Sequence, residues 1–244
     1  MGRKRRGQPI HGWVAIDKPT GRTSAQVTAK VRRVLDAAKA GHGGTLDPIA
    51  TGVLPIALGE ATKTVSYVMD GQKRYRFTVR WGEERTTDDL EGDVTNVNAG
   101  RPSEAEILSV LPEFIGVIEQ VPPDFSAIKL DGKRAYDLAR AGEVVTIAKR
   151  EVYIEEFSLV SMPDEDHAVF EVASGKGTYM RSVARDIARR LGTVGHIAEL
   201  RRTHCGPFSE TASISLESLE TLVHSAAPSA YLLAVETALD DIPA

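Results

Sequence analysis

The sequence has almost no cysteine and no long apolar run. Cys205 is the one cysteine among 244 residues. A single thiol excludes an internal disulfide, and no spacing of cysteine and histidine along the chain resembles a zinc site. No apolar run is long enough to cross a membrane, and the basic residues 3–6 are not followed by the apolar segment of a secretory signal. We therefore expect a protein of the reducing cytoplasm without a membrane segment.

Cofactor motifs are missing as well. Residues 174–178 read Ser-Gly-Lys-Gly-Thr, which suggests a phosphate loop, but Phe170 stands where a Walker motif requires glycine. Residues 83–93 hold six acids and one arginine, yet their spacing does not follow a calcium loop, so we expect this stretch to be solvated. The sequence therefore predicts no metal and no cofactor.

Charge is unevenly spread along the chain. The net charge is −4, but residues 1–39 carry ten Lys/Arg against two acids, and residues 171–202 carry seven against three. Residues 203–244 hold six acids and no Lys or Arg. One folded body with a basic face would suit a phosphate backbone. On composition alone, a set of solvated charge runs explains the pattern equally well.

The hydrophobic pattern predicts strands interleaved with helices. Thr23 to Gln26 fits a capping box that starts a helix, which we expect to continue until Gly41 stops it. Further helices are predicted at residues 61–69 and 103–111, with a weak one at 215–235, and strands at 13–16, 74–81, 152–159 and 168–173. This order is compatible with an α+β fold.

One stretch is organised around a single side chain, Asp47. Glycines before it permit unusual backbone conformations, and Pro48 disfavours the α region for Asp47, so we expect a rigid, non-helical turn. A carboxylate there can act as nucleophile, general base or electrostatic stabiliser. In the alternative, Asp47 caps a helix that Pro48 begins, but Gly52 and Pro55 would break that helix within two turns.

The stretch also carries a resemblance to a known family. Its residues are Gly41-His42-Gly43-Gly44-Thr45-Leu46-Asp47-Pro48-Ile49-Ala50-Thr51-Gly52-Val53-Leu54-Pro55, followed by Gly59-Glu60-Ala61-Thr62-Lys63. They closely resemble the catalytic segment of the TruB family of tRNA pseudouridine synthases. The resemblance implies that Asp47 is the catalytic residue and that His42 contacts the RNA where the target uridine is extruded. We expect Lys63, at the end of the segment, to contact RNA as well.

Two further segments resemble motifs of the same family. Residues 18–24 resemble its first motif, which packs beside the catalytic loop, and we expect Lys18 to help bind the RNA or the base. In the family's Lys-Arg-Tyr segment the tyrosine, here Tyr75, stacks on the target base. By its strand pattern alone Tyr75 is a core aromatic.

The Lys-Gly-Thr-Tyr-x-Arg motif of the family matches residues 176–181. Its arginine, here Arg181, forms a salt bridge with the catalytic aspartate in the family. By helical spacing alone, Arg181 with Arg185 and Arg189 is only a basic helix face. Residues 196–203 resemble the family's Leu-Arg-Arg strand, which implies that Leu200 packs against the base pocket, and we expect Arg202 to contact RNA.

The resemblance also implies a domain organisation. Residues 1–9 would be a basic tail, and residues 10–225 the catalytic domain, with an insertion at about 124–150 that clamps the T arm and presents Lys129 to phosphates. Residues 226–244 would be an acidic remainder, too short for the complete C-terminal PUA domain of many relatives.

The implied fold is a mixed, mostly antiparallel sheet flanked by helices, the pseudouridine synthase fold. The implied reaction isomerises uridine to pseudouridine at position 55 in the T loop of tRNA, through base flipping and an aspartate-dependent cleavage and re-formation of the glycosidic bond. We expect Asp47, Tyr75 and Arg181 to be the catalytic residues, in a monomer without an obligatory protein partner. Whether Asp47 attacks the base, attacks the sugar or removes a proton is left open.

Two other functions stay open at this point. An RNA chaperone would fold tRNA through the same surface without catalysis, although an aspartate at position 47 does not favour it. A guide-RNA-dependent ribosomal RNA synthase of the archaeal and eukaryotic type would rely on the C-terminal domain and would lack the T-arm insertion.

Overall fold

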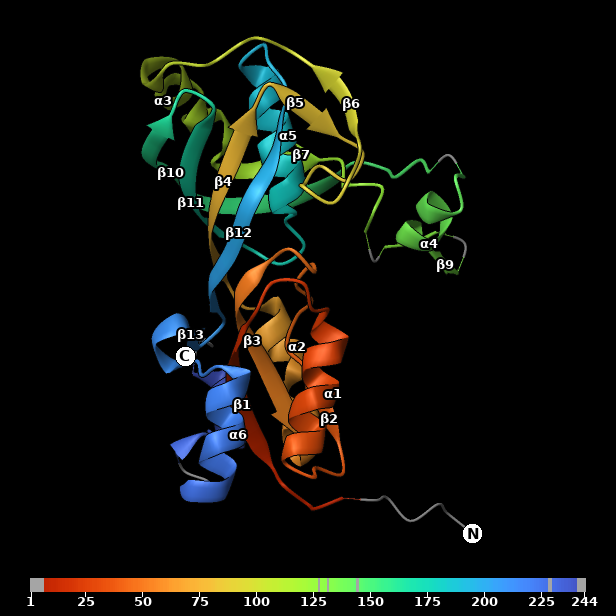
Figure 1. Cartoon of the computed structure of the whole chain (residues 1–244), viewed down its shortest axis with the longest axis vertical. Coiled ribbons are helices and arrows are strands. Elements are labelled where there is room, and N and C mark those ends of the chain that lie inside the picture. The colour runs from red at the N-terminus through yellow and green to blue at the C-terminus, as the bar shows by residue number, and fades with distance from the viewer. Residues whose placement is uncertain (1–6, 127, 131, 144, 228–229, 241–244) are drawn as a thin grey trace. The chain divides into compact units, whose positions relative to one another are not determined.

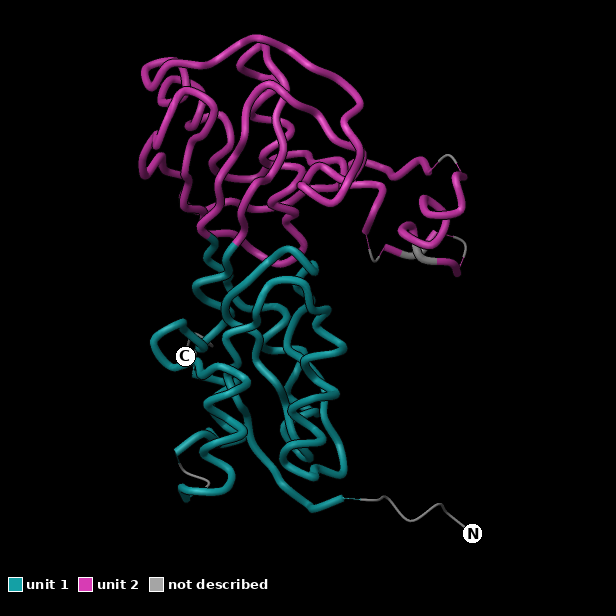
Figure 2. The backbone as a smooth tube through the Cα atoms, viewed as in Figure 1, with its two compact units in different colours: residues 1–75, 201–244 teal, residues 76–200 magenta. Residues whose placement is uncertain are grey.

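The computed structural model describes residues 7–126, 128–130, 132–143, 145–227 and 230–240. The chain divides into two compact units (Figure 2). Unit 1 contains residues 1–75 and 201–244, and unit 2 contains residues 76–200. The strands β4 (Lys73–Trp81) and β12 (Gly195–Cys205) each contribute residues to both units.

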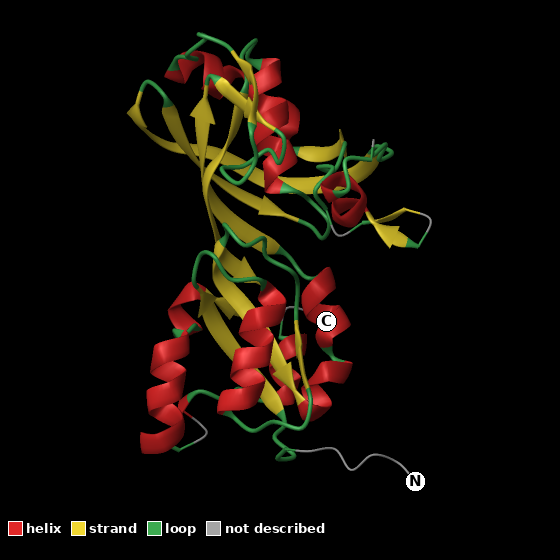
Figure 3. Ribbon diagram, turned by 45° about the vertical axis from the view of Figure 1, so that its right-hand side comes forward, coloured by secondary structure: helices red, strands yellow, loops and turns green. Residues whose placement is uncertain are grey.

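Unit 1 combines strands with helices that pack beside them (Figures 1 and 3). Besides the first residues of β4 and the last of β12, its elements are β1 (Gly12–Lys18), α1 (Ser24–Val34), β2 (Ala40–His42), β3 (Thr51–Leu58), the 3₁₀ helix η1 (Gly59–Lys63), α2 (Val65–Asp70), β13 (Phe208–Ser209), η3 (Glu210–Ala212), α6 (Leu216–Ser225) and η5 (Val235–Leu239).

The strand β3 is the centre of this unit. It pairs antiparallel with β1 and β2 and parallel with the end of β12. In this register Gly52, near the start of β3, lies opposite Lys18 on one side and Arg202 on the other. Residues 43–50 join β2 to β3, so this loop meets the sheet beside two cations, Lys18 and Arg202.

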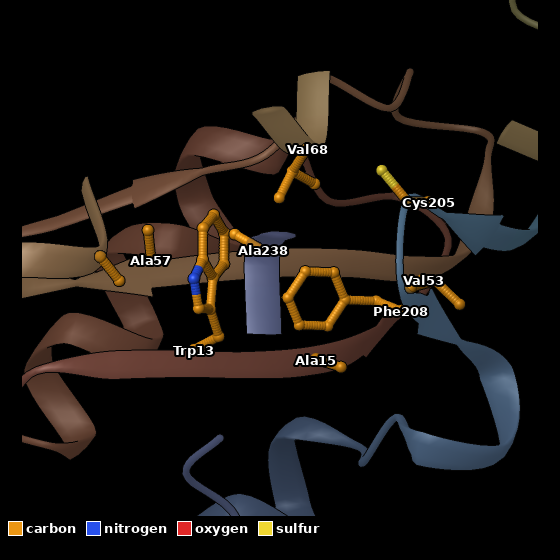
Figure 4. Packing of buried hydrophobic residues seen from close by; sticks show 9 residues of the cluster. Trp13, Ala15, Val53, Ala57, Val68, Cys205, Phe208 and Ala238 are labelled. Carbon is orange, nitrogen blue, oxygen red and sulfur yellow. The ribbon is translucent and has the colours of Figure 1, made fainter. Parts of the chain in front are cut away.

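An apolar cluster fills the interior of unit 1 (Figure 4). The rings of Trp13 from β1 and Phe208 from β13 lie 5.2 Å apart between their centroids, and Val68 from α2 belongs to the same cluster. Cys205, at the end of β12, is fully buried there. The one thiol of the chain is thus a core residue.

The helix α1 begins as predicted and ends early. Thr23 is its N-cap, and the capping box with Gln26 is present, which confirms the sequence prediction. The prediction that the helix continues to Gly41 is wrong, because it ends at Val34 and Asp36 takes a positive φ of 46°. The following residues instead form β2, whose backbone groups pair with β3. The predicted helix at 61–69 is likewise split into η1 and α2.

Unit 2 contains the remaining strands of the central sheet, in the order β12-β4-β11-β10-β7. The pairs β10–β11 and β10–β7 are antiparallel. Its elements are β5 (Glu83–Arg85), β6 (Val94–Val97), α3 (Glu104–Val110), η2 (Leu111–Phe114), β7 (Gly116–Gln120), β8 (Lys129–Leu130), β9 (Lys133–Arg134), α4 (Ala135–Arg140), β10 (Arg150–Asp164), β11 (His167–Ser174) and α5 (Met180–Arg190). Aromatic rings pack in its core, among them Phe77, Phe157 and Phe170.

The acidic stretch at residues 83–93 is not simply solvated, which corrects the sequence expectation. Asp88 and Asp89 are buried in unit 2. Arg185 donates to the Asp88 carboxylate at 2.9 Å, and Arg181 Nε lies 3.6 Å from Asp89 Oδ2. Both arginines are buried on α5, so the expected basic helix face is partly an internal ion-pair network. The sequence does not reveal these ion pairs, because the paired residues are far apart in the chain.

The predicted fold class is confirmed, since the chain has an α+β fold with a mixed, mostly antiparallel central sheet. Parts of the predicted insertion, residues 127, 131 and 144, lie outside the described residues. The predicted boundaries of the catalytic domain, the insertion and the acidic remainder stay predictions. Within the described ranges, no helix is long and apolar enough to span a membrane.

Gly52 offers a test of this arrangement. Its φ is +95°, and an added Cβ would lie 2.2 Å from the carbonyl oxygen of Arg202. We expect Gly52→Ala to lower the free energy of unfolding by more than the roughly 1–2 kcal/mol that left-handed backbone alone costs. Chemical denaturation measures this loss.

Gly21→Ala is the matched control for that variant. Gly21 also has a positive φ, +76°, but an added Cβ meets no atom within 4 Å. The free energy of unfolding of Gly21→Ala should therefore fall only by the backbone cost. Equal losses in the two variants would show that the contact with β12 is not tight.

Candidate active site

The loop that carries Asp47 is held by hydrogen bonds rather than by regular structure. Residues 43–50, all of them described, form no helix or strand. Every carbonyl oxygen in this loop accepts a bond. The donors, in loop order, are Cys205 Sγ to Gly43, Arg202 to Gly44 and Thr45, Ser24 Oγ to Leu46, Ala50 N to Asp47, Lys18 and Gly21 N to Pro48, Thr20 Oγ1 to Ile49, and Lys18 to Ala50.

Lys18 holds the end of the loop from inside the protein. Its side chain is fully buried, and Nζ donates to the carbonyls of Pro19 at 3.0 Å, Pro48 at 3.2 Å and Ala50 at 2.6 Å. A buried ammonium group is tolerated only when its donors are satisfied, as they are here. Lys18 therefore fixes the backbone that follows Asp47.

Arg202 holds the start of the loop in the same way. It is 2% exposed, and its guanidinium group donates to the carbonyls of Val53 at 2.8 Å, Gly44 at 3.1 Å and Thr45 at 3.5 Å. Arg202 and Lys18 flank Gly52 in the sheet, so the register of the strands places both cations at the ends of one loop. An RNA contact for either residue stays a prediction.

Asp47 occupies a turn. Its side chain is half-buried, and its carbonyl accepts the Ala50 N–H at 3.1 Å. No helix begins at Pro48, because β3 starts at Thr51. The helix-cap alternative is therefore excluded, and the predicted non-helical turn is confirmed.

Tyr75 lies close to this loop in unit 1. The charges of Arg202 and Asp47 both act on its hydroxyl. Although the whole residue is only half-buried, burial of the phenol raises its pKa above the ordinary value, against the opposing effect of Arg202. The phenol is therefore neutral at physiological pH.

His42 ends β2 directly before the loop. Burial lowers the pKa of its imidazole, and the positive charge of Arg202 lowers it further, so the ring is neutral at pH 7. Its Nδ1 is buried and has no hydrogen-bond partner among the residues that the structure describes. A neutral imidazole carries one donor and one acceptor nitrogen, so this buried nitrogen keeps an unused capacity for a hydrogen bond.

The other predicted site residues belong to η1 of unit 1 and to unit 2. Lys63, on η1 of unit 1, is exposed and pairs with Glu60. Arg181 and Leu200 are buried in unit 2, where Arg181 donates to the carbonyls of Thr87 and Phe125, both at 2.9 Å. Lys129 belongs to β8 of unit 2. The predicted ion pair of Arg181 with Asp47 stays a prediction.

The sequence did not reveal every residue that shapes the loop. Ser24 follows the helix cap Thr23 and passed as part of the capping motif, but its hydroxyl bonds to Leu46. The sequence indicates only that Cys205 is the single thiol, whereas its Sγ donates to the carbonyl of Gly43 in the loop. Across the described residues, no cluster of His, Cys, Asp and Glu side chains is arranged to hold a metal ion.

Replacing Lys18 separates a structural role from direct RNA binding. We expect Lys18→Met to lower the free energy of unfolding of the RNA-free protein by about 1–3 kcal/mol, because buried carbonyls lose their donor. Lys63→Met, which removes an exposed cation, should leave this free energy nearly unchanged and weaken the salt dependence of RNA binding instead. Denaturation curves and RNA titrations at several salt concentrations measure both. A Lys18→Met protein of unaltered stability would contradict the loop contacts.

His42 predicts a pH dependence of stability. Its folded pKa lies below the reference value of 6.5, so the unfolded chain takes up the proton first as the pH falls. The stabilising contribution is present above pH 6.5 and is lost as the pH falls through the folded pKa. Below pH 6.5 we expect the wild type to lose stability relative to His42→Gln. Denaturation curves recorded from about pH 7.5 downwards measure this loss. Parallel pH profiles of the two proteins would disprove the lowered pKa.

Comparison with known proteins identifies the family of the chain. Residues 32–180 match the family described as TruB family pseudouridylate synthase (N terminal domain), and residues 181–240 match the tRNA pseudouridylate synthase B C-terminal domain. The chain is 59% identical to tRNA pseudouridine synthase B of Bradyrhizobium diazoefficiens, over 99% of this chain and 71% of that protein. It is 56% identical to the protein of the same name from Rhodospirillum rubrum, over 100% of this chain and 79% of that protein.

Solved structures show the same similarity. The chain resembles a chain in the crystal structure of a Cbf5-Nop10-Gar1 complex with a TM-score of 0.77 and 30% identity, over 96% of this chain and 63% of that one. The matched segments include the loop of Asp47 and the strand of Tyr75. Because the family models, the curated relatives and the fold agree, the chain belongs to the TruB family of pseudouridylate synthases.

Proposed function

We propose that this protein converts uridine to pseudouridine at position 55, in the T loop of tRNA. Its membership of the TruB family and its identity to tRNA pseudouridine synthases B support this activity. The observation that carries the chemistry is Asp47, presented by a loop whose every carbonyl is bonded, beside the neutral phenol of Tyr75. A carboxylate held in one direction is suited to act on one substrate atom.

The reaction is an isomerisation. The bond between N1 of the base and C1′ of the sugar breaks, the uracil rotates, and C5 of the base joins C1′ while its proton is released and N1 gains one. Asp47 attacks the base or the sugar, or removes a sugar proton. All three roles need the ionised carboxylate next to the extruded nucleoside.

The uridine must first leave its stack, which costs a few kcal/mol. Tyr75 would offset part of this cost by stacking on the extruded ring, because base–aromatic stacking is worth about 1–3 kcal/mol. The raised pKa of the Tyr75 phenol favours a stacking or hydrogen-bonding role over that of a phenolate base. The reaction also requires a group that takes up the C5 proton. His42 would brace the space that the base vacates.

Arg181 would pair with Asp47 and keep it ionised and oriented through charge-assisted hydrogen bonds. Leu200 would pack against the base, while Lys63 and Lys129 would bind phosphates. For Lys18 and Arg202, the buried contacts support an effect on RNA through the loop rather than through direct contact.

The partner would be the T arm of tRNA, clamped by the insertion at residues 124–150. We infer a monomer that acts in the cytoplasm without a metal, a cofactor or an obligatory protein partner. The likeness to the Cbf5 structure keeps a guide-RNA-dependent synthase as an alternative, but relatives that are 56–59% identical are named as tRNA enzymes, which favours tRNA.

Asp47→Asn tests the assignment directly. The variant keeps the size and the turn but loses the carboxylate, so we expect turnover to fall by about 10,000-fold or more while tRNA affinity stays nearly unchanged. Tritium release from 5-tritiated uridine in unmodified tRNA and in a T-arm minihelix measures turnover, and filter binding measures affinity.

Asp36→Asn is the matched control, since Asp36 is an exposed carboxylate of unit 1 outside the loop. It should behave like the wild type in both assays. Retained turnover in Asp47→Asn would overturn the mechanism. Tight tRNA binding by the wild type without tritium release would favour the chaperone function instead.

A further inference from the structure

A buried serine outside the loop controls the backbone directly before Asp47. Ser24 Oγ donates to the carbonyl oxygen of Leu46 at 3.0 Å and accepts the Leu46 N–H at 2.8 Å. Ser24 is 3% exposed and Leu46 is 4% exposed, so water cannot easily replace these bonds. One hydroxyl thus satisfies both polar backbone groups of the residue that precedes Asp47.

The two bonds restrain the backbone from which the Asp47 side chain extends. The Leu46 carbonyl belongs to the peptide plane that ends at the nitrogen of Asp47. The peptide plane that follows Asp47 is held as well, because the Asp47 carbonyl accepts the Ala50 N–H at 3.1 Å. With both planes fixed, φ and ψ of Asp47 are set, and these dihedrals determine where its Cβ lies, from which the carboxylate extends.

Ser24 is itself firmly placed. It is the first residue of α1, and its own carbonyl accepts the Thr28 hydroxyl at 2.8 Å. Capping of the helix is done by its neighbour Thr23, whose side chain accepts the Gln26 N–H. The Ser24 hydroxyl is therefore not needed for capping and is available to the loop.

We propose that Ser24 is a positioning residue for the isomerisation, which acts through the Leu46 backbone to hold Asp47 in its reactive direction. This inference rests on the proposed function of Asp47. It predicts a defect in the chemical step rather than in substrate binding, because the hydroxyl is buried and bonded to the backbone of the loop.

Ser24→Ala tests the proposal. It removes both hydrogen bonds and leaves the helix cap intact. We expect the single-turnover rate of tritium release at saturating tRNA to fall by about 10- to 100-fold, as a small misplacement of a reacting group does. The affinity for unmodified tRNA should stay within about twofold of the wild type, since the basic surface is unchanged.

Thr23→Ala is the matched control on the same helix. Thr23 is exposed and caps α1 without touching the loop, so its loss lowers the unfolding midpoint but should leave the single-turnover rate within about twofold of the wild type. This contrast separates loss of position from loss of helix stability. Equal rate losses in Thr23→Ala and Ser24→Ala would show a merely structural effect and would overturn the proposal.

A second variant guards against poor folding of Ser24→Ala. Ser24→Cys keeps a side chain of similar size but offers only a weak donor and a weak acceptor. We expect a folded protein, checked by circular dichroism, with a reduced single-turnover rate. A wild-type rate in Ser24→Cys or in Ser24→Ala would refute the positioning role. Absence of tritium release from the wild type would refute the proposed function itself.

Discussion

The loop that presents Asp47 depends on two buried cations that enter from neighbouring strands. Lys18 and Arg202 lie on either side of Gly52, and between them they bind carbonyls at both ends of residues 43–50. An irregular segment that passes through a protein interior would otherwise bury carbonyl groups without donors, at about 1–3 kcal/mol each. Each cation in turn avoids the larger penalty of an unpaired buried charge. The two requirements are met together, so the loop and the cations stabilise each other.

This mutual dependence has a consequence for catalysis. A loop whose carbonyls are all satisfied has few alternative conformations of similar free energy, so the backbone that carries Asp47 is ordered without a ligand. In the proposed function, the energy of RNA binding would then be used to extrude the uridine rather than to order the loop. Arg202 extends this arrangement, because the same side chain that holds Gly44 and Thr45 also acts electrostatically on the hydroxyl of Tyr75. One cation thus acts on both the loop and the nearby phenol.

The sequence predicted those features that depend on neighbouring residues. The capping box at Thr23, the strand of Tyr75 and the turn at Asp47 all follow from local spacing, and the structure has each of them. It did not predict that Arg202 would bind Gly44, or that Asp88 would be buried against Arg185. Those contacts join residues that the strand register and the packing of α5 bring together. Charge alone suggested a solvated surface for them, since an isolated sequence cannot show which charged groups find partners inside the fold.

Both units use the same means to fix a functional backbone. In unit 1 the Ser24 hydroxyl binds the N–H and the carbonyl of Leu46, directly before Asp47. In unit 2 the buried amide of Gln120 accepts the Tyr179 N–H at 2.8 Å and donates to its carbonyl at 3.2 Å. Tyr179 is the N-cap of α5, and its own side chain makes no capping bond to a described residue. Gln120 therefore anchors the start of the helix that carries Arg181 two residues later. In each case one neutral side chain, rather than a charged one, holds the backbone close to a charged residue, Asp47 in unit 1 and Arg181 in unit 2.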